Sequence, residues 1–197
     1  MPITRDPRTL RGGEVDGDGY QRVSSKTSPY PHWYSEHKGD LYIANFANVS
    51  FDTANPNEIV AFIKNTSESN YLTIDEIRCQ VVDPGATLPI YTTYLDLVRG
   101  LTFSAIGDGS VVTPRNMNFT AKDNASADCY QDNITVTGTA VQLDKRIPLA
   151  DEGAFLLGQS LSEGGFVLGQ NDTIAVRYES ATSAGYIYCT IIFHFED

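Results

Sequence analysis

Short runs of alternating apolar and polar residues fill most of the chain from residue 40 onward. The clearest is YIYCTIIFHF, residues 186–195. Because successive side chains of a strand point to opposite faces, this run predicts a strand with one core-facing side. Its inward set is Ile187, Cys189, Ile191, Phe193 and Phe195. The opposite side carries Tyr186, Tyr188 and Ile192 and is also partly apolar, so we expect something to cover it.

Nine further runs have the length and residue types of strands, and no stretch has a convincing helical period. The ten expected strands are 41–51, 58–65, 71–82, 89–98, 101–106, 134–141, 154–158, 165–169, 173–180 and 186–195. Turn-forming residues separate them, and the polar segment 122–133 is interpreted as an exposed loop. This pattern predicts an all-β fold, a jelly-roll-like two-sheet β-sandwich whose last strand is central and paired on both sides.

The first 39 residues have neither strand nor helix periodicity. They mix turn formers with isolated aromatic residues, which a purely disordered tail would contain less often. We therefore divide the chain into an extended N-terminal arm, residues 1–39, and a β-sandwich domain, residues 40–197. The aromatic residues indicate that part of the arm docks on its own domain or on a neighbour.

The charge distribution excludes one large class of function. The net charge is −11, and residues 1–39 hold six Lys/Arg against five Asp/Glu, which leaves eight against twenty for the domain. A nucleic-acid partner is not expected, because binding to phosphates requires a basic surface. No apolar stretch is long enough to span a bilayer and no secretory signal is recognisable, so we expect no membrane and synthesis in a cytoplasm.

No catalytic, metal-binding or cofactor-binding pattern is found, and we predict that the protein is not an enzyme. The three cysteines have neither disulfide-framework nor zinc spacing, and Cys79 and Cys189 are expected to be small core residues. His194 is expected to point outward at a sheet surface. Adjacent acidic residues such as Asp75 and Glu76 should face opposite ways and so cannot share one cleft wall.

The remaining indication of function is the set of aromatic residues expected on the surface. The outward set on 186–195, together with two tyrosines of 89–98, gives more aromatic area than a monomer normally exposes. One interpretation is a subunit interface, in which tyrosine is enriched. The other is that both faces of the last strand are internal. The expected oligomer interface consists of Tyr91, Tyr94, Tyr186, Tyr188 and Ile192.

The layout of an arm, the unit EIVAFIKNTSESNYLTIDEIRCQVV, the stretch RIPLADEGAFLLGQSLSEGGFVLGQNDTIAVRYES and a final strand resembles small virion structural proteins of tailed bacteriophages. The nearest type is the jelly-roll decoration or cement protein of the capsid. The resemblance implies a location in the virion after synthesis in the host cytoplasm, a homotrimer, contact with the major capsid protein or another virion protein, and an arm that clamps neighbouring capsid subunits. The arm residues expected to bind the capsid are Arg5, Arg8, Arg11, Tyr20, Tyr30, Trp33 and Tyr34.

An alternative is a host-binding module, either a fibre tip or a carbohydrate-binding β-sandwich. In that case aromatic side chains would stack on sugar rings. The candidate platforms are Trp33, Tyr91, Tyr94 and Tyr130. A β-sandwich hydrolase or lyase is the least favoured hypothesis, because no catalytic spacing supports it.

Overall fold

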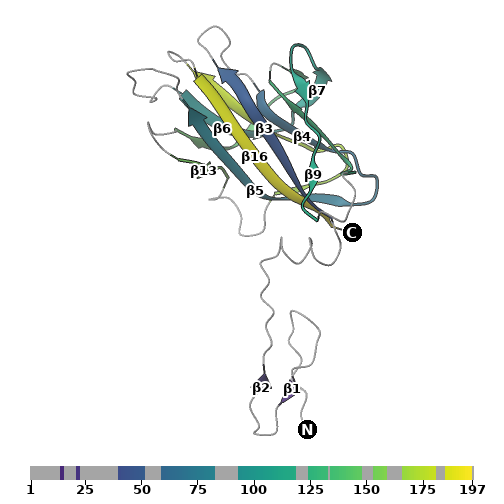
Figure 1. Cartoon of the computed structure of the whole chain (residues 1–197). Helices are drawn as coiled ribbons and strands as arrows, with labels where there is room; N and C mark the ends of the chain where they lie inside the picture. Colours follow the sequence, from purple (N-terminus) through teal and green to yellow (C-terminus); the bar gives the residue numbers. More distant parts are fainter. Residues whose placement is uncertain are drawn as a thin grey trace.

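The computed structural model describes ten segments of the chain. They are residues 14–15, 21–22, 40–51, 59–82, 93–118, 124–132, 134–147, 153–158, 166–180 and 185–196. Every regular element in these segments is a strand, so the fold is all-β (Figure 1). Within the same segments no helix is long and apolar enough to cross a membrane.

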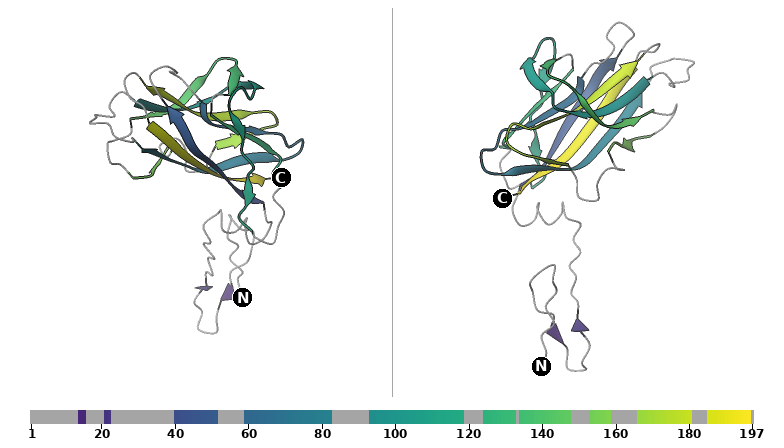
Figure 2. Two further views of the ribbon diagram at one scale, coloured as in Figure 1. Left: turned by 45° about the horizontal axis from the view of Figure 1, so that its top comes forward. Right: turned by 180° about the vertical axis from the view of Figure 1, so that it is seen from behind.

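Two large antiparallel sheets form the sandwich, and we name them after their central strands (Figure 2). The β16 sheet has the order β13-β5-β16-β3-β9, with β14 also paired to β5. Its strands are β3 Leu41–Phe51, β5 Tyr71–Val82, β9 Arg115–Asn116, β13 Phe155–Leu156, β14 Phe166–Leu168 and β16 Gly185–Glu196. The β15 sheet has the order β12-β6-β15-β4-β10-β8. Its strands are β4 Ile59–Asn65, β6 Thr93–Arg99, β8 Ser110–Val111, β10 Ala127–Gln131, β12 Val141–Arg146 and β15 Thr173–Ser180.

The chain alternates between the sheets in the manner of a jelly roll. The eight main strands in chain order are β3, β4, β5, β6, β12, the divided strand β13/β14, β15 and β16. In the β16 sheet the neighbours are β3, β16, β5 and β13/β14, which are the first, eighth, third and sixth of these strands. In the β15 sheet they are β4, β15, β6 and β12, which are the second, seventh, fourth and fifth. This is jelly-roll topology. The prediction of a two-sheet sandwich with a central last strand is confirmed, since β16 pairs with β3 on one side and β5 on the other.

The core lies between the two sheets and is made by the inward positions of both. Those of β16 are buried as the alternation predicts, and Phe193 stacks on Tyr42 of β3 with ring centroids 5.7 Å apart. From the β15 sheet, Ile174, Val176 and Tyr178 face the same core. Burying a side chain of this size contributes about 1.5–3 kcal/mol each, so this layer provides most of the stability.

The segment between β6 and β12 is an insertion into the eight-stranded plan. It adds β10 and β8 beside β4, and β9 beside β3, so it widens both sheets. It also contains β7 Thr102–Ala105 and β11 Thr135–Thr137, which pair with each other. Phe103 and Val136 of this pair pack on a second apolar cluster that includes Phe62 and Val98. The outer side of the β15 sheet is therefore partly covered.

Two sequence predictions fail in this insertion. Segment 122–133 was expected to be an exposed loop, yet it contains β10, where Ala127 packs against the core and Cys129 is buried in it. The expected strand 134–141 is divided at Gly138, whose φ is +94°, into β11 and the start of β12. Both errors arise because these strands are short and mostly polar, so their alternation is weak.

Of the predicted arm, the structure describes β1 Glu14–Val15 and β2 Gln21–Arg22, which pair with each other. The rest of residues 1–39 lies outside the described residues.

Candidate functional site

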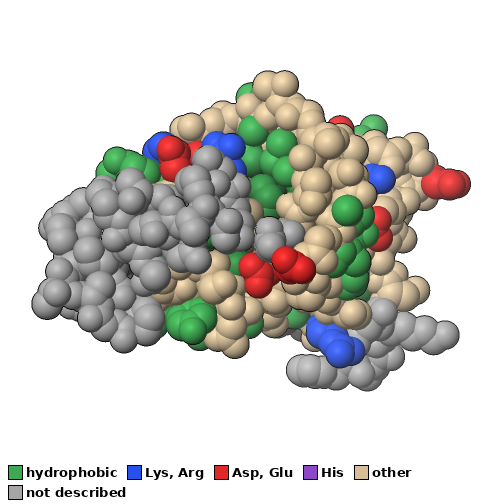
Figure 3. All heavy atoms as spheres, turned by 90° about the horizontal axis from the view of Figure 1, so that it is seen from above, with side chains coloured by type: hydrophobic (Ala, Val, Ile, Leu, Met, Phe, Trp, Pro, Cys, Tyr) green, Lys and Arg blue, Asp and Glu red, His purple; other side chains and the backbone are tan. Residues whose placement is uncertain are grey.

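The outer side of the β16 sheet has an open end, where β16 begins and β3 and β5 end. Tyr186 is 41% exposed and Tyr188 is 38% exposed. Tyr186 lies opposite Val82 of β5, which is exposed as well. We call Val82, Tyr186 and Tyr188 the tyrosine face. Figure 3 looks down on this end of the sandwich, and hydrophobic side chains are visible there among polar and charged ones.

Hydrogen bonds from β16 to β3 fix part of this surface. The Tyr188 hydroxyl donates to Oδ1 of Asn48 at 2.6 Å, and the Thr190 hydroxyl donates to Oδ1 of Asn45 at 3.0 Å. Asn48 has a φ of +56°, a left-handed conformation that asparagine tolerates better than most residues. Tyr188 is thus held in one orientation, and less side-chain entropy remains to be lost on binding a partner.

The opposite end of the same outer side is closed. His194 alternates with core residues, as expected, but it is 0% exposed, so the prediction of a residue at the sheet surface is wrong. Its Nδ1 lies 2.8 Å from Oδ2 of Asp75, and its Nε2 lies 3.0 Å from Oε1 of Glu196. Burial lowers the pKa of His194, but the hydrogen bonds and negative charges of the two carboxylates outweigh it and raise the pKa above the ordinary 6.5.

A β-bulge in β5 places Asp75 beside this histidine. Opposite Ile192 stands Glu76, and opposite Phe193 stands Ile74, so Asp75 is the extra residue. Asp75 contacts His194 while Glu76 pairs with Arg78 at 2.5 Å, which puts both carboxylates on the outer side. The expectation that Asp75 and Glu76 face opposite ways is therefore wrong, because the bulge interrupts the alternation.

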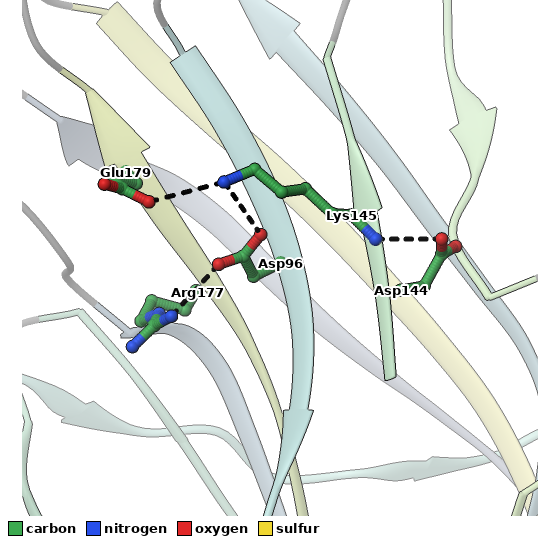
Figure 4. Close-up of polar contacts among 5 residues, drawn as sticks. All are labelled: Asp96, Asp144, Lys145, Arg177 and Glu179. Carbon is green, nitrogen blue, oxygen red and sulfur yellow. Dashed lines mark hydrogen bonds and ion pairs between the residues drawn. The ribbon is translucent and has the colours of Figure 1, made fainter. Parts of the chain in front are cut away.

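A charged cluster occupies the outer side of the β15 sheet (Figure 4). Asp96 of β6 is only 1% exposed, and its Oδ2 accepts a hydrogen bond from Arg177 of β15 at 3.0 Å. The Lys145 ammonium of β12 lies 3.8 Å from the other Asp96 oxygen and 3.5 Å from Glu179. These charges neutralise one another across three neighbouring strands, so the cluster joins β12, β6 and β15.

The two described candidates for sugar stacking have ring faces that are already in contact. Tyr94 lies in the β15 sheet with the Lys145 ammonium 4.1 Å from its ring centroid. Tyr130 stacks on Phe103 with centroids 4.1 Å apart and an interplanar angle of 9°. Burial, followed by the charges of Asp128 and Cys129, raises the pKa of Tyr130. Neither ring offers two free faces to a ligand.

A cavity of about 410 Å³ opens at one end of the sandwich. It lies between the end of β6, the start of β12, strand β14 and the turn before β15. Leu101, Leu168 and Ile174 form part of its apolar lining, while Arg99 and Asp172 add charged groups. Its volume is in the range of small-molecule sites. Sequence reasoning did not predict this cavity, because the contributing segments come together only through the sheet topology.

The predicted interface residues fall in different places. Tyr186 and Tyr188 lie together on the open end of the β16 sheet, and Ile192 is half-buried on the same side. Tyr94 belongs to the other sheet, so the expected five-residue surface is not continuous among the described residues. The other predicted positions lie outside the described residues: Arg5, Arg8, Arg11, Tyr20, Tyr30, Trp33, Tyr34 and Tyr91.

Within the described residues, no group of three or more His, Cys, Asp or Glu side chains is arranged to hold a metal ion. No protein-family model matches the chain, and no curated protein matches it significantly. The candidate function is therefore argued from the geometry above.

Proposed function

We propose that the chain is a non-enzymatic structural protein of a tailed-phage virion, a decoration or cement protein that stabilises the capsid shell. Its domain would form a homo-oligomer, with a trimer favoured, and residues 1–39 would bind the major capsid protein or another virion protein. It would be made in the host cytoplasm and become part of the particle.

The observation that carries the proposal is the tyrosine face. Val82, Tyr186 and Tyr188 are exposed together on a sheet whose central strand already has both of its backbone neighbours. Edge-to-edge strand addition at β16 is thereby excluded, and contact must use side chains. Tyrosine is enriched in protein interfaces because its ring is buried while its hydroxyl keeps a polar partner, as Tyr188 does with Asn48.

The jelly-roll topology also supports the proposal, although a fold hosts many functions. Eight-stranded jelly rolls are common in viral capsid and lectin domains. An oligomer with several arms gains avidity, because after the first arm binds, the others meet their sites at high effective concentration. Several weak arm contacts would then together give tight binding of the oligomer to the shell.

The decisive experiment is binding to shells assembled from the major capsid protein of the same virus. The full chain should co-sediment with shells, and deletion of residues 1–35 should abolish binding while circular dichroism still shows a folded β domain. Substituting Arg5, Arg8 and Arg11 by serine in the full chain tests the same contact without a deletion. Full occupancy by the truncated protein would refute the clamp, and a monomer at all concentrations in light scattering would refute the oligomer.

The second candidate function is a tail- or head-fibre module that binds host carbohydrate. The cavity beside Arg99 favours it, because an apolar floor with charged and polar groups at the rim suits the mixed surface of a sugar ring. A glycan array separates the two hypotheses. Selective glycan binding that is lost in Arg99→Ala would support this candidate, whereas no glycan signal together with shell binding would support the cement protein.

A further inference from the structure

Two of the three cysteines face each other across the centre of the β16 sheet. Cys79 of β5 and Cys189 of β16 are directly opposite in the antiparallel register. Their sulfur atoms are 3.5 Å apart, and both residues are essentially unexposed. Cys129 lies on β10 in the other sheet, and all three are free thiols.

The backbone already meets most of the geometric requirement for a bond between these two thiols. Directly opposite residues of antiparallel strands have Cα atoms about 4.5–5.5 Å apart, inside the range seen for disulfides. The sulfur atoms need to approach by about 1.5 Å, since an S–S bond is about 2.05 Å long. Because each sulfur atom moves when its cysteine rotates about χ1, the remaining approach requires side-chain rotation rather than a movement of the strands.

We propose that Cys79 and Cys189 are a site of oxidative modification, and that they form a cross-strand disulfide when the chain folds in an oxidising medium. The inference does not depend on the proposed function. It rests on the register of β5 and β16 and on the distance between the two sulfur atoms.

The reaction needs an external disulfide as oxidant, for which oxidised glutathione serves as the probe. The thiolate of one cysteine attacks a glutathione sulfur, which breaks the S–S bond and releases one glutathione thiolate. The second cysteine, after losing its proton, attacks the protein sulfur of this mixed disulfide and releases the second glutathione. Two protein S–H bonds are lost, one S–S bond forms, and two glutathione thiols take up the electrons and protons.

The surroundings of the pair determine when this chemistry occurs. The hydrogen bond with Cys79 and burial among core residues both raise the pKa of Cys189 well above its ordinary value. The thiolate is therefore scarce in the folded domain, and a bulky oxidant has no access to the core. We expect fast oxidation during refolding, before β16 is buried, and slow oxidation of the native state.

The bond would join positions 110 residues apart in the chain. A cross-link across a long loop lowers the entropy of the unfolded chain and so stabilises the native state. For a domain of this size we expect the thermal midpoint to rise by roughly 5–15 °C.

The test is refolding of the full chain from denaturant with a mixture of oxidised and reduced glutathione. The expected product has one free thiol, a mass lower by about 2 Da, and a peptide map in which the segments with Cys79 and Cys189 are linked. Its midpoint should exceed that of the same sample after reduction. Cys129→Ala should behave like the natural chain, whereas Cys79→Ala should show no midpoint change on oxidation.

Three results would overturn the proposal. They are a chain that keeps three free thiols after refolding, a disulfide that includes Cys129, and a mixed disulfide with glutathione at Cys79 or Cys189 that never closes to the cross-strand bond. A Cys79–Cys189 bond that leaves the midpoint unchanged or lowers it would contradict the expected stabilisation. Cys79→Ala also removes a buried sulfur, so each variant is compared with its own reduced form rather than with the natural chain.

Discussion

His194 holds two carboxylates together at the closed end of the β16 sheet. The contacts come from Asp75 on β5 and from Glu196 two residues along β16. Each is a charge-assisted hydrogen bond when the imidazole is protonated, and such bonds are about twice as strong as neutral ones. At this end of the sheet, stability should therefore depend on the charge of a single side chain.

We expect a specific pH dependence from this arrangement. The folded pKa of His194 is raised above 6.5, so its contribution to the free energy of unfolding is fully present below pH 6.5 and is lost as pH rises through the folded pKa. Urea titrations between pH 5 and 9 should show this loss, and NMR should place the His194 pKa above 6.5. His194→Gln should remove this part of the dependence.

Two other histidines, His32 and His37, provide the control. Their joint substitution by glutamine should leave the pH dependence of the free energy of unfolding unchanged. If this substitution removes the pH dependence instead, the titrating group is not His194.

Gly185 shows how tightly the first residue of β16 is packed. An added Cβ would lie 2.6 Å from the carbonyl oxygen of Val82 and 2.7 Å from the Phe51 ring. Gly185→Ala should lower the free energy of unfolding by about 1–3 kcal/mol, because one contact is rigid backbone. Gly153→Ala, where nothing lies within 4 Å, is the matched control and should change it by less than about 0.5 kcal/mol. Equal effects in a denaturant titration would contradict the packing argument.

At the scale of strands, the charged cluster links β12, β6 and β15 through Asp96. Arg177 is its near partner at 3.0 Å and Lys145 its distant one at 3.8 Å. Arg177→Met would leave a buried carboxylate with only the distant cation, so we expect a loss of about 2–4 kcal/mol. Lys145→Met should cost less than about 1 kcal/mol. Urea unfolding at low salt measures both, and the reverse order would disprove this assignment.

The longer strands could be predicted from sequence because one side of each is strongly apolar. The bounds of β3, β5 and β15 are as predicted. β10 was missed since its sequence ADCYQ is short and contains no large aliphatic residue to mark the alternation. The contact between His194 and Asp75 was missed for a different reason. It depends on the bulge at Asp75, and a bulge is set by the pairing of two distant strands, which alternation within one strand does not reveal.

At the scale of the whole molecule, the tyrosine face lies at one end of the outer side of the β16 sheet. Alternation placed Tyr186 and Tyr188 there from sequence, but it also grouped them with Tyr94, which the topology puts on the other sheet. Side-chain direction is a local property, whereas sheet membership is not. Sequence reasoning therefore named two residues of the tyrosine face, but it missed Val82, which the strand pairing places opposite Tyr186.

The proposed self-association through the tyrosine face leads to a paired prediction. Tyr186→Ser should weaken the oligomer roughly tenfold or more, since buried tyrosines often dominate interface energies. Tyr71→Ser is the control, because Tyr71 is 54% exposed on the same sheet but at its far end. Analytical ultracentrifugation over a concentration series measures both. If Tyr71→Ser has the larger effect, the contact lies at the other end.

The place of β16 also bears on how the protein is made. β16 lies between β3, the first strand of the sandwich, and β5, so residues 41–51 emerge from the ribosome long before their neighbour exists. Until residues 185–196 have been translated, β3 and β5 have a gap between them, and their apolar sides stay exposed to other nascent chains. We therefore expect the domain to reach its native state only after translation of β16, and ribosome-bound chains that stop at residue 180 to be degraded by protease as readily as an unfolded polypeptide.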